Sequence, residues 1–406
     1  TLSGNVKISG AKNSVLPIMA ASILGNKNSV ISRVPDLRDT RTMIRLLEII
    51  GAKCTFSDGI LSVDSSKVDN PEAPYELVKT MRASFYVMGP LLAKFGEVKV
   101  SLPGGCAWGP RPVDFHLKGF EKLGAEIILE SGYIIARAKS LKGAEISFDF
   151  PSVGATGNIL MAAVMAEGKT IIRNAAKEPE IVQLCDFLNL MGANISGIGT
   201  SNITIEGVES LNSADIKIIP DRIEAGTFLI AGALLGEITL EDINFNHLRS
   251  IVLKLKEVGC EMVNDNNSIK IKPAMLINPV DISTAVFPGF PTDLQAQWVA
   301  LMTLSQGSAV ITDNVYKDRF SHIPELNRLG AKIKVDQNSA WVKGVKILKG
   351  AQVMSTDIRA SAALIIGGLA AEGVTEVQRV YHIDRGYERI EQKFSLLGAK
   401  ITRVSA

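Results

Sequence analysis

The sequence predicts an α/β fold of two similar domains, with helices in the interior and sheets on the outside. Three observations predict this fold: a length of 406 residues, two series of regularly spaced glycines, and helical segments that are apolar on every side. Because a single hydrophobic core rarely serves more than about 250–300 residues, the length by itself favours two domains.

Two series of glycines mark an internal repeat. Neighbouring members of each series are 66 to 73 residues apart. The first series is Gly25, Gly96, Gly168, Gly236, Gly307 and Gly373, and the second is Gly51, Gly124, Gly192, Gly259, Gly330 and Gly398. Self-similarity at a fixed period indicates one structural unit that has been copied. Six copies divide naturally into three per domain.

Each copy reads as a βαβαββ unit. An amphipathic pattern such as EIVQLCDFLNLMGA precedes the second glycine, which suits the left-handed position that ends a helix, and a strand such as AKIKV follows. Before the first glycine lies a helix that is apolar nearly all round, such as NILMAAVMA, and helices without a polar face are buried. The predicted fold is a two-domain inside-out α/β barrel built from six βαβαββ repeats, three per domain.

The apolar helices begin with polar or charged residues. These starts contain Lys12-Asn13, Arg82, Ser152 to Thr156, Asp221-Arg222, Asp293, and Asp357 to Arg359. Asp, Asn, Ser and Thr at such positions most often cap free backbone N–H groups. Lys and Arg oppose the helix dipole, so Lys12, Arg82 and Arg359 need another partner, and an anionic ligand would supply one.

Composition argues against several classes of function. A net charge of +2 gives no case for nucleic acid or a membrane surface, and no apolar run could span a bilayer. There is no signal-peptide pattern, and the separated cysteines lack a CxxC motif, so we expect reduced thiols in a cytoplasmic protein. Cys54, Cys185 and Cys260 are predicted to be core filler. The scattered histidines form no metal motif, so no metal site is expected.

The stretch LPGGCAWGPRPVDFH, residues 102–116, holds Cys106 among three glycines and three prolines, with Arg111 five residues away. Such a loop does not suit a packed core, which argues for a functional thiol. At a reference pKa of about 8.5 the thiol is mostly protonated and can donate a proton. Arg111 should lower that pKa and favour a nucleophilic thiolate. The sequence leaves both roles open.

These features resemble the enolpyruvyl transferase family. The resemblance extends over the whole chain and includes SGAKNSVLPIMAA, LPGGCAWGPRPVD, SVGATGNI, FPGFPTDLQAQ and YHIDRGYERIE. It implies one domain at 12–218, with the cysteine loop as a lid, and a second at 1–11 and 219–406, with the active site in the cleft between them. It also implies transfer of the enolpyruvyl group of phosphoenolpyruvate to an acceptor hydroxyl, without a cofactor.

Within this family the cysteine loop resembles the branch whose acceptor is the 3-hydroxyl of UDP-N-acetylglucosamine. That reaction releases phosphate and is the first committed step of peptidoglycan synthesis, so it serves cell-wall biogenesis, cell shape, the cell cycle and cell division. The resemblance also implies that the antibiotic fosfomycin reacts with Cys106.

The resemblance further implies roles for single residues. The catalytic groups would be Lys12, Cys106, Arg111, Asp293, Asp357 and Arg385, with Asp293 as the general base facing the sugar hydroxyl. The substrates would be bound by Lys12, Asn13, Arg82, Arg111, Pro112, Val113, Asp114, Phe115, Phe150, Ser152, Val153, Gly154, Asp293, Val315, Arg359 and Arg385. Fixed cations are what a substrate with a carboxylate and a phosphate requires.

Three alternatives remain at this point. The first is the sister branch of the shikimate pathway, which uses another acceptor and lacks the cysteine loop. The second is a non-catalytic repeat scaffold, which would not need cations at buried helix starts. The third is an RNA 3′-phosphate cyclase of related fold, which would require a nucleotidylated histidine and a more basic face.

Overall fold

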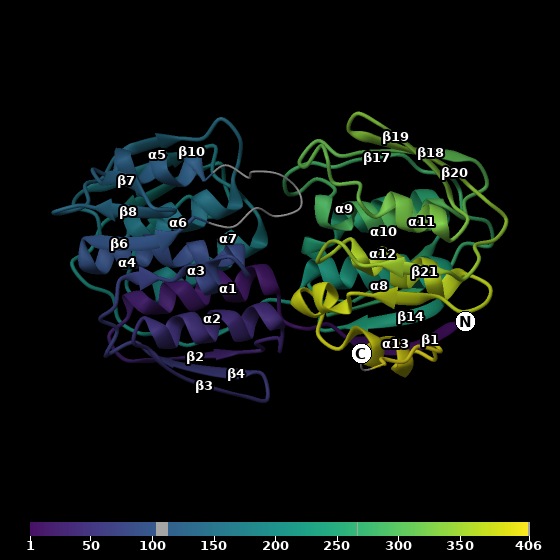
Figure 1. The fold of residues 1–406 in the computed structure, drawn as a ribbon, viewed down its shortest axis with the longest axis horizontal. Coiled ribbons are helices and arrows are strands. Elements are labelled where there is room, and N and C mark those ends of the chain that lie inside the picture. Colours follow the sequence, from purple (N-terminus) through teal and green to yellow (C-terminus); the bar gives the residue numbers. More distant parts are fainter. Residues whose placement is uncertain (103–112, 266, 405–406) are drawn as a thin grey trace. The chain divides into compact units, whose positions relative to one another are not determined.

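The computed structural model describes residues 1–102, 113–265 and 267–404. The chain forms two compact units: the N unit, Gly10–Ile219, and the C unit, Thr1–Ser9 together with Pro220–Ala406. The chain therefore passes between the units twice, after Ser9 and after Ile219 (Figure 1). Each unit has its own hydrophobic core.

The N unit contains three four-stranded sheets of one design. Their strand orders are β13-β2-β4-β3, β5-β6-β8-β7 and β9-β10-β12-β11, each with one parallel pair followed by an antiparallel hairpin. The strands are β2 (Asn28–Ser32), β3 (Lys53–Ser57), β4 (Ile60–Asp64), β5 (Glu72–Ala73), β6 (Glu97–Ser101), β7 (Glu126–Glu130), β8 (Tyr133–Arg137), β9 (Glu145–Ser147), β10 (Lys169–Arg173), β11 (Asn194–Ser196), β12 (Asn202–Glu206) and β13 (Ile216–Lys217).

The interior of the N unit is helical. Its inner helices are α1 (Lys12–Ala21), α4 (Met88–Phe95), which follows the 3-10 turn η2 (Arg82–Val87), and α6 (Val153–Ala163). The other helices are α2 (Arg38–Ile49), α3 (Tyr75–Val78), α5 (Asp114–Lys122) and α7 (Pro179–Leu190). α7 is more buried than its amphipathic pattern predicts, because it packs against both α1 and α6.

The C unit repeats this architecture with one departure. Its sheets are β1-β14-β16-β15, β17-β18-β20-β19 and the two-stranded β21-β22. The strands are β1 (Leu2–Lys7), β14 (Gly236–Glu241), β15 (Glu261–Asn264), β16 (Ser268–Lys272), β17 (Ile282–Ser283), β18 (Ser308–Thr312), β19 (Lys332–Asp336), β20 (Ser339–Lys343), β21 (Gln352–Met354) and β22 (Glu376–Gln378). The strand predicted after Gly398 does not form, since the described residues offer no second hairpin strand to pair with it.

Figure 1 shows the inner helices of the C unit between its sheets. They are α8 (Arg222–Leu235), α10 (Gln295–Met302), which follows the 3-10 turn η4 (Thr292–Leu294), and α12 (Ser361–Ala370). The remaining helices are α9 (Arg249–Val258), α11 (Ile323–Arg328), α13 (Ile390–Leu396) and the 3-10 turn η5 (Val380–Arg385). All eight residues of α10 are buried. The predicted inside-out arrangement is confirmed.

The glycine series has the predicted conformation. All six glycines of the second series have φ between 88° and 107°, which is the left-handed region. A residue with a Cβ atom is strained there, so glycine at these positions ends the second helix of each repeat and turns the chain toward the next strand.

Candidate active site

In the C unit, two aspartates bind backbone N–H groups at or just before the starts of inner helices and also pair with an arginine. Oδ1 of Asp221 accepts the N–H groups of Ile223 at 2.9 Å and Glu224 at 3.0 Å, at the start of α8. Oδ1 of Asp357 accepts the N–H groups of Arg359 at 2.8 Å and Ala360 at 2.7 Å, before α12. Asp221 is therefore the cap of α8, as the sequence suggested, whereas Asp357 holds the turn just before α12, whose capping position is Ala360.

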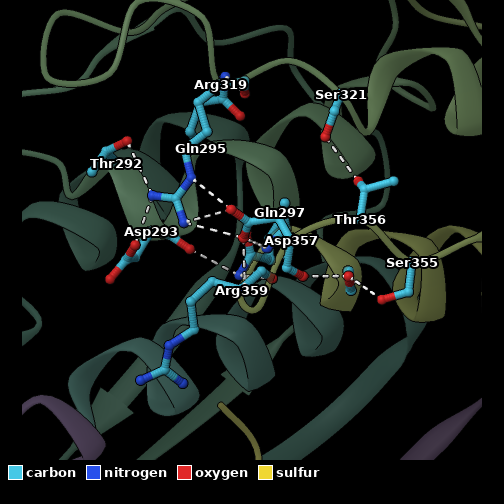
Figure 2. Close-up of polar contacts among 12 residues, drawn as sticks. Thr292, Asp293, Gln295, Gln297, Arg319, Ser321, Ser355, Thr356, Asp357 and Arg359 are labelled. Carbon is cyan, nitrogen blue, oxygen red and sulfur yellow. Dashed lines mark hydrogen bonds and ion pairs between the residues drawn. The ribbon is translucent and has the colours of Figure 1, made fainter. Parts of the chain in front are cut away.

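Arg319 joins two of the predicted site carboxylates (Figure 2). It lies in the loop between β18 and α11, with Nη1 2.7 Å from Oδ1 of Asp293 and Nη2 3.1 Å from Oδ1 of Asp357. The side chain of Asp293 remains 26% exposed, whereas those of Arg319 and Asp357 are 8% and 5% exposed. Asp293 is thus the carboxylate of this cluster that a ligand can reach.

The charges in this cluster determine its protonation. Burial by itself would raise the pKa of Asp293, but Arg319 and Arg359 outweigh burial and hold that pKa well below its usual range. Burial likewise opposes ionisation of Asp357, and Arg319 with two backbone N–H groups lowers the pKa of that carboxyl. Both aspartates are therefore ionised at neutral pH.

Arg359 is also held from several sides. Its Nη2 is 2.7 Å from Oδ2 of Asp221, its Nη1 donates to the carbonyl of Gly386 at 2.6 Å, and its guanidinium lies 5.0 Å from the ring centre of Tyr387. Arg359 therefore has the partner that the sequence analysis required, and it is a protein carboxylate, the second oxygen of the α8 cap. Arg385, beside Gly386, is half-buried at the end of η5.

The side-chain amide of Gln297 links the backbone at Asp293 to the backbone at Arg359. Its Nε2 donates to the carbonyls of Asp293 at 3.0 Å and Arg359 at 3.2 Å, and lies 3.1 Å from the hydroxyl of Tyr387. One buried amide on α10 therefore sets the starts of α10 and α12 relative to each other (Figure 2).

In the N unit, Lys12 also has a protein partner. It is the first residue of α1, is buried, and its Nζ lies 2.9 Å from Oδ2 of Asp39 in the first turn of α2. The partner that the sequence analysis required for Lys12 is therefore also a protein carboxylate. Asn13 follows it on α1, and Arg82 is the first residue of η2; both are half-buried.

The starts of α5 and α6 lie together in the N unit. The hydroxyl of Ser152 accepts the N–H of Ala155 at 3.2 Å and caps α6, whose first residues are Val153 and Gly154. A Cβ atom on Gly154 would lie 3.3 Å from the ring of His116 on α5, so only glycine leaves the ring undisturbed.

The other predicted nucleotide contacts of the N unit surround this point. Val113 precedes α5, Asp114 is exposed in its first turn, and the ring centre of Phe115 lies 5.8 Å from that of Phe148. The side chain of Phe150 is 43% exposed. Cys106, Arg111 and Pro112 lie outside the described residues, as does most of the predicted lid.

Buried histidines in both units predict a loss of stability in mild acid. Burial lowers the pKa of His116 and of His322 from 6.5 to about 3. Between those values the unfolded chain binds more protons, so the free energy of unfolding should fall as the pH decreases, by up to about 1.4 kcal/mol per pH unit for each histidine. This fall should extend from about pH 6.5 downward.

His322→Phe tests this linkage. Among the described residues neither ring nitrogen of His322 has a hydrogen-bond partner, so Phe keeps the shape and removes the titration. Urea titrations between pH 5 and pH 7.5 give the free energy of unfolding of the C unit at each pH. In the variant this free energy should depend less steeply on pH than in the wild type, by the equivalent of about one proton. An unchanged slope in the variant would contradict the assignment.

Several residues at these sites escaped the sequence analysis. Arg319, Asp39 and Asn158 lie far along the chain from the residues that they contact, and Asp313 binds both its own turn and the distant Thr292. The amide of Asn158 donates to Nδ1 of His116 at 3.1 Å, and Asp313 holds the N–H of Val315 at 3.0 Å. For Asp313 alone a signal was available, namely its place directly after the strand β18 in TDN.

Searches of the described residues for other site types gave two findings. No group of three or more His, Cys, Asp or Glu side chains is arranged to hold a metal ion in residues 1–102, 113–265 and 267–404. In the same ranges no helix has the length and apolar character that crossing a membrane requires.

Comparisons with known proteins give the class. The chain matches the family EPSP synthase (3-phosphoshikimate 1-carboxyvinyltransferase) over residues 1–394. The enolpyruvyl transferase NikO from Streptomyces tendae has the same fold, with a TM-score of 0.89 at 25% identity over 98% of this chain and 95% of its own. EPSP synthase from Acinetobacter baumannii shares the fold alone, with a TM-score of 0.75 at 16% identity over 98% of this chain and 96% of its own. Fold and family together define an enolpyruvyl transferase, and the predicted transferase activity class is confirmed.

Sequence relatives narrow the class. A protein of Chloroherpeton thalassium named UDP-N-acetylglucosamine 1-carboxyvinyltransferase is 57% identical over 99% of this chain and 95% of its own length. A protein of Caldanaerobacter subterraneus named UDP-N-acetylglucosamine 1-carboxyvinyltransferase 1 is 53% identical over 99% of this chain and 97% of its own. The chain belongs to the EPSP synthase family and, within it, to the UDP-N-acetylglucosamine 1-carboxyvinyltransferases.

Proposed function

We propose that this enzyme transfers the enolpyruvyl group of phosphoenolpyruvate to the 3-hydroxyl of UDP-N-acetylglucosamine and releases phosphate. The observation that carries the proposal is the 57% identity, over almost the whole chain, to a relative named for this reaction. The reaction begins peptidoglycan synthesis in the bacterial cytoplasm, and through the cell wall it supports cell shape and division.

The transfer is an addition followed by an elimination. The sugar O3 forms a bond to C2 of phosphoenolpyruvate and loses its proton while C3 gains one. The bond from C2 to the phosphate oxygen then breaks, C3 loses a proton, and the enolpyruvyl ether remains. Asp293 accepts the hydroxyl proton, Cys106 is a proton donor or a nucleophile, and Asp357 takes part in the proton transfers.

The ion pairs of the C unit suggest when Asp293 becomes a base. In the absence of substrate, Arg319 and Arg359 hold its pKa low, and such a carboxylate is a weak base. An anionic substrate bound near these arginines offsets their positive charge, so the pKa of Asp293 should rise once phosphoenolpyruvate is in place. The base would then gain strength when both substrates are bound.

The cations that bind phosphoenolpyruvate would be Lys12, Arg111 and Arg385, with Arg359 nearby. Lys12 and Arg359 already have the partners Asp39 and Asp221. These carboxylates hold the two cations in place at helix starts, so that little side-chain ordering remains to be done when the substrate binds. The sugar nucleotide would contact Asn13, Arg82, the residues at the starts of α5 and α6, and Val315.

A 3-deoxy analogue of the sugar nucleotide tests the acceptor position. With UDP-N-acetylglucosamine, mass spectrometry should detect the enolpyruvyl product and an equal amount of phosphate. With UDP-3-deoxy-N-acetylglucosamine, which lacks the acceptor oxygen, no transfer product should form. Product formed from the deoxy analogue would contradict the assignment of the 3-hydroxyl.

Fosfomycin labelling should locate the reactive thiol. A thiolate opens the epoxide, forming a carbon–sulfur bond while the oxygen takes up a proton. Burial raises the pKa of Cys54 and Cys185 to about 12 and also raises that of Cys260, so these thiols stay protonated. We expect Cys106→Ala to lose the mass shift in the intact protein, and the control Cys185→Ala to keep it. Labelling that persists in Cys106→Ala would place the reactive thiol elsewhere.

A further inference from the structure

We propose that Asp313 is a positioning residue that holds two parts of the C unit's acceptor site at once, the backbone at Val315 and the segment that carries Asp293. The inference rests on the proposed function, because it takes Val315 as a sugar-nucleotide contact and Asp293 as the base. Asp313 itself touches neither substrate nor reacting atoms in this assignment.

The first oxygen of Asp313 fixes the turn after β18. The side chain is completely buried. Its Oδ1 accepts the N–H groups of Val315 at 3.0 Å and Tyr316 at 2.8 Å, and the hydroxyl of Thr284 at 2.7 Å. The same hydroxyl accepts the N–H of Asn314 at 3.0 Å, so the whole turn from 313 to 316 is tied to the end of β17.

The second oxygen of Asp313 binds Thr292, the residue next to the proposed base. Its Oδ2 accepts the hydroxyl of Thr292 at 2.7 Å, and Thr292 directly precedes Asp293 in η4. Nη1 of Arg319, 2.7 Å from Oδ1 of Asp293, also donates to Oγ1 of Thr292 at 3.4 Å. Because the hydroxyl of Thr292 donates its proton to Asp313, its lone pairs are free to accept from Arg319. Figure 2 shows the contact between Thr292 and Arg319.

An aspartate that only holds a turn uses one of its two carboxylate oxygens. Asp265, in the β15–β16 hairpin, holds the N–H groups of Asn267 at 2.9 Å and Ser268 at 2.7 Å with Oδ1 alone. In the described residues no lysine or arginine pairs with Asp313, and its two oxygens are bound by four neutral donors. Burying a carboxylate without a cation is costly. The contact of Oδ2 with Thr292, next to the base, is what distinguishes Asp313 from such a turn.

The two oxygens of Asp313, here called its two arms, thus hold the proposed nucleotide contact, Val315, in position relative to the proposed base, Asp293. If either arm is lost, the acceptor hydroxyl and Asp293 can shift relative to each other. Misplacement of a reacting group by about 1 Å can lower the rate by about 100-fold. The effect should therefore appear in kcat when the arm to Thr292 is lost, and in the KM for the sugar nucleotide when the turn is lost.

Steady-state phosphate release by the full chain separates the arms. Thr292→Val and Asp313→Asn disturb the arm to the base, and Asn keeps an oxygen for the turn; both should lower kcat between about 10-fold and 100-fold, with the KM for UDP-N-acetylglucosamine within about 3-fold. Their combination should lower kcat no further than the stronger single variant, because both remove the same contact. Asp313→Ala should in addition raise that KM and leave the KM for phosphoenolpyruvate unchanged.

Asp265→Ala is the matched control, because Asp265 holds an Asx-type turn in another sheet of the same unit. This variant should retain wild-type kcat and KM. Additive effects in the double variant, wild-type kcat in Asp313→Asn, or a parallel change of both KM values together with a lower Tm would overturn the inference. A wild-type enzyme that releases no phosphate with UDP-N-acetylglucosamine would instead overturn the proposed function on which the inference rests.

Discussion

Asp293→Asn is expected to lower kcat by about 10²- to 10⁴-fold, the range that a positioned general base contributes. Asn is close in shape to Asp and can still accept the hydrogen bond from Nη1 of Arg319, now 2.7 Å from Oδ1. It cannot take up the proton of the sugar hydroxyl. The dissociation constant of UDP-N-acetylglucosamine, measured by calorimetry, should therefore stay within about 3-fold while phosphate release nearly stops.

Asp281→Asn is the control for this prediction. Asp281 also lies in the C unit and accepts the N–H of Val310 at 2.7 Å, at an exposed position away from Asp293. It should behave as wild type in both measurements. A kcat for Asp293→Asn within about 3-fold of wild type would remove Asp293 from the role of base.

The second large effect concerns stability. Arg319→Met should lower the free energy of unfolding of the C unit by about 3–5 kcal/mol, because two carboxylates would lose their common cation while at least one of them remains buried. Methionine approximates the volume of the arginine stem, so the loss reflects charge more than packing. Without the guanidinium, burial should raise the pKa of both Asp293 and Asp357.

Arg403→Met provides a matched comparison. Arg403 also bridges two carboxylates, with Nη2 2.6 Å from Asp384 and 3.1 Å from Glu391, but its side chain is 39% exposed. Surface ion pairs contribute about 0–1 kcal/mol, so this variant should lose little stability in the same urea titration. Equal losses in the two variants would mean that burial of the Arg319 cluster has no energetic consequence.

The fold could be predicted because its signals are local and repeated. Apolar helices such as α10 and α12 report their burial in their own composition, and the glycine that ends each second helix is visible in every copy. The missing hairpin after Gly398 could not be predicted, since the segment FSLLGAKI looks like the other copies. Whether this segment forms a strand depends on a partner strand, which the described residues do not provide.

The site could be predicted in part, for a related reason. Capping and the helix dipole act over one turn, so the sequence showed Asp221, Asp293 and Asp357 at helix starts. Their ion pairs are tertiary contacts, and no local pattern indicates Arg319, which comes from a different loop.

Carboxylate geometry explains how one side chain can serve two partners. A carboxylate has two oxygens, and a cap uses only one of them. Asp221 thus caps α8 and pairs with Arg359, and Asp313 holds its turn and Thr292, with one side chain each. For Lys12 the partner is Asp39 in the first turn of α2, which the sequence analysis did not identify.

Phosphate release from phosphoenolpyruvate is the most direct test of the proposed reaction. The purified full chain would be supplied with phosphoenolpyruvate and either UDP-N-acetylglucosamine, shikimate 3-phosphate or no acceptor. We predict steady release with UDP-N-acetylglucosamine alone. Release with shikimate 3-phosphate, or release that does not depend on an acceptor, would contradict the assignment of the sugar nucleotide as acceptor and of Asp293 as its base.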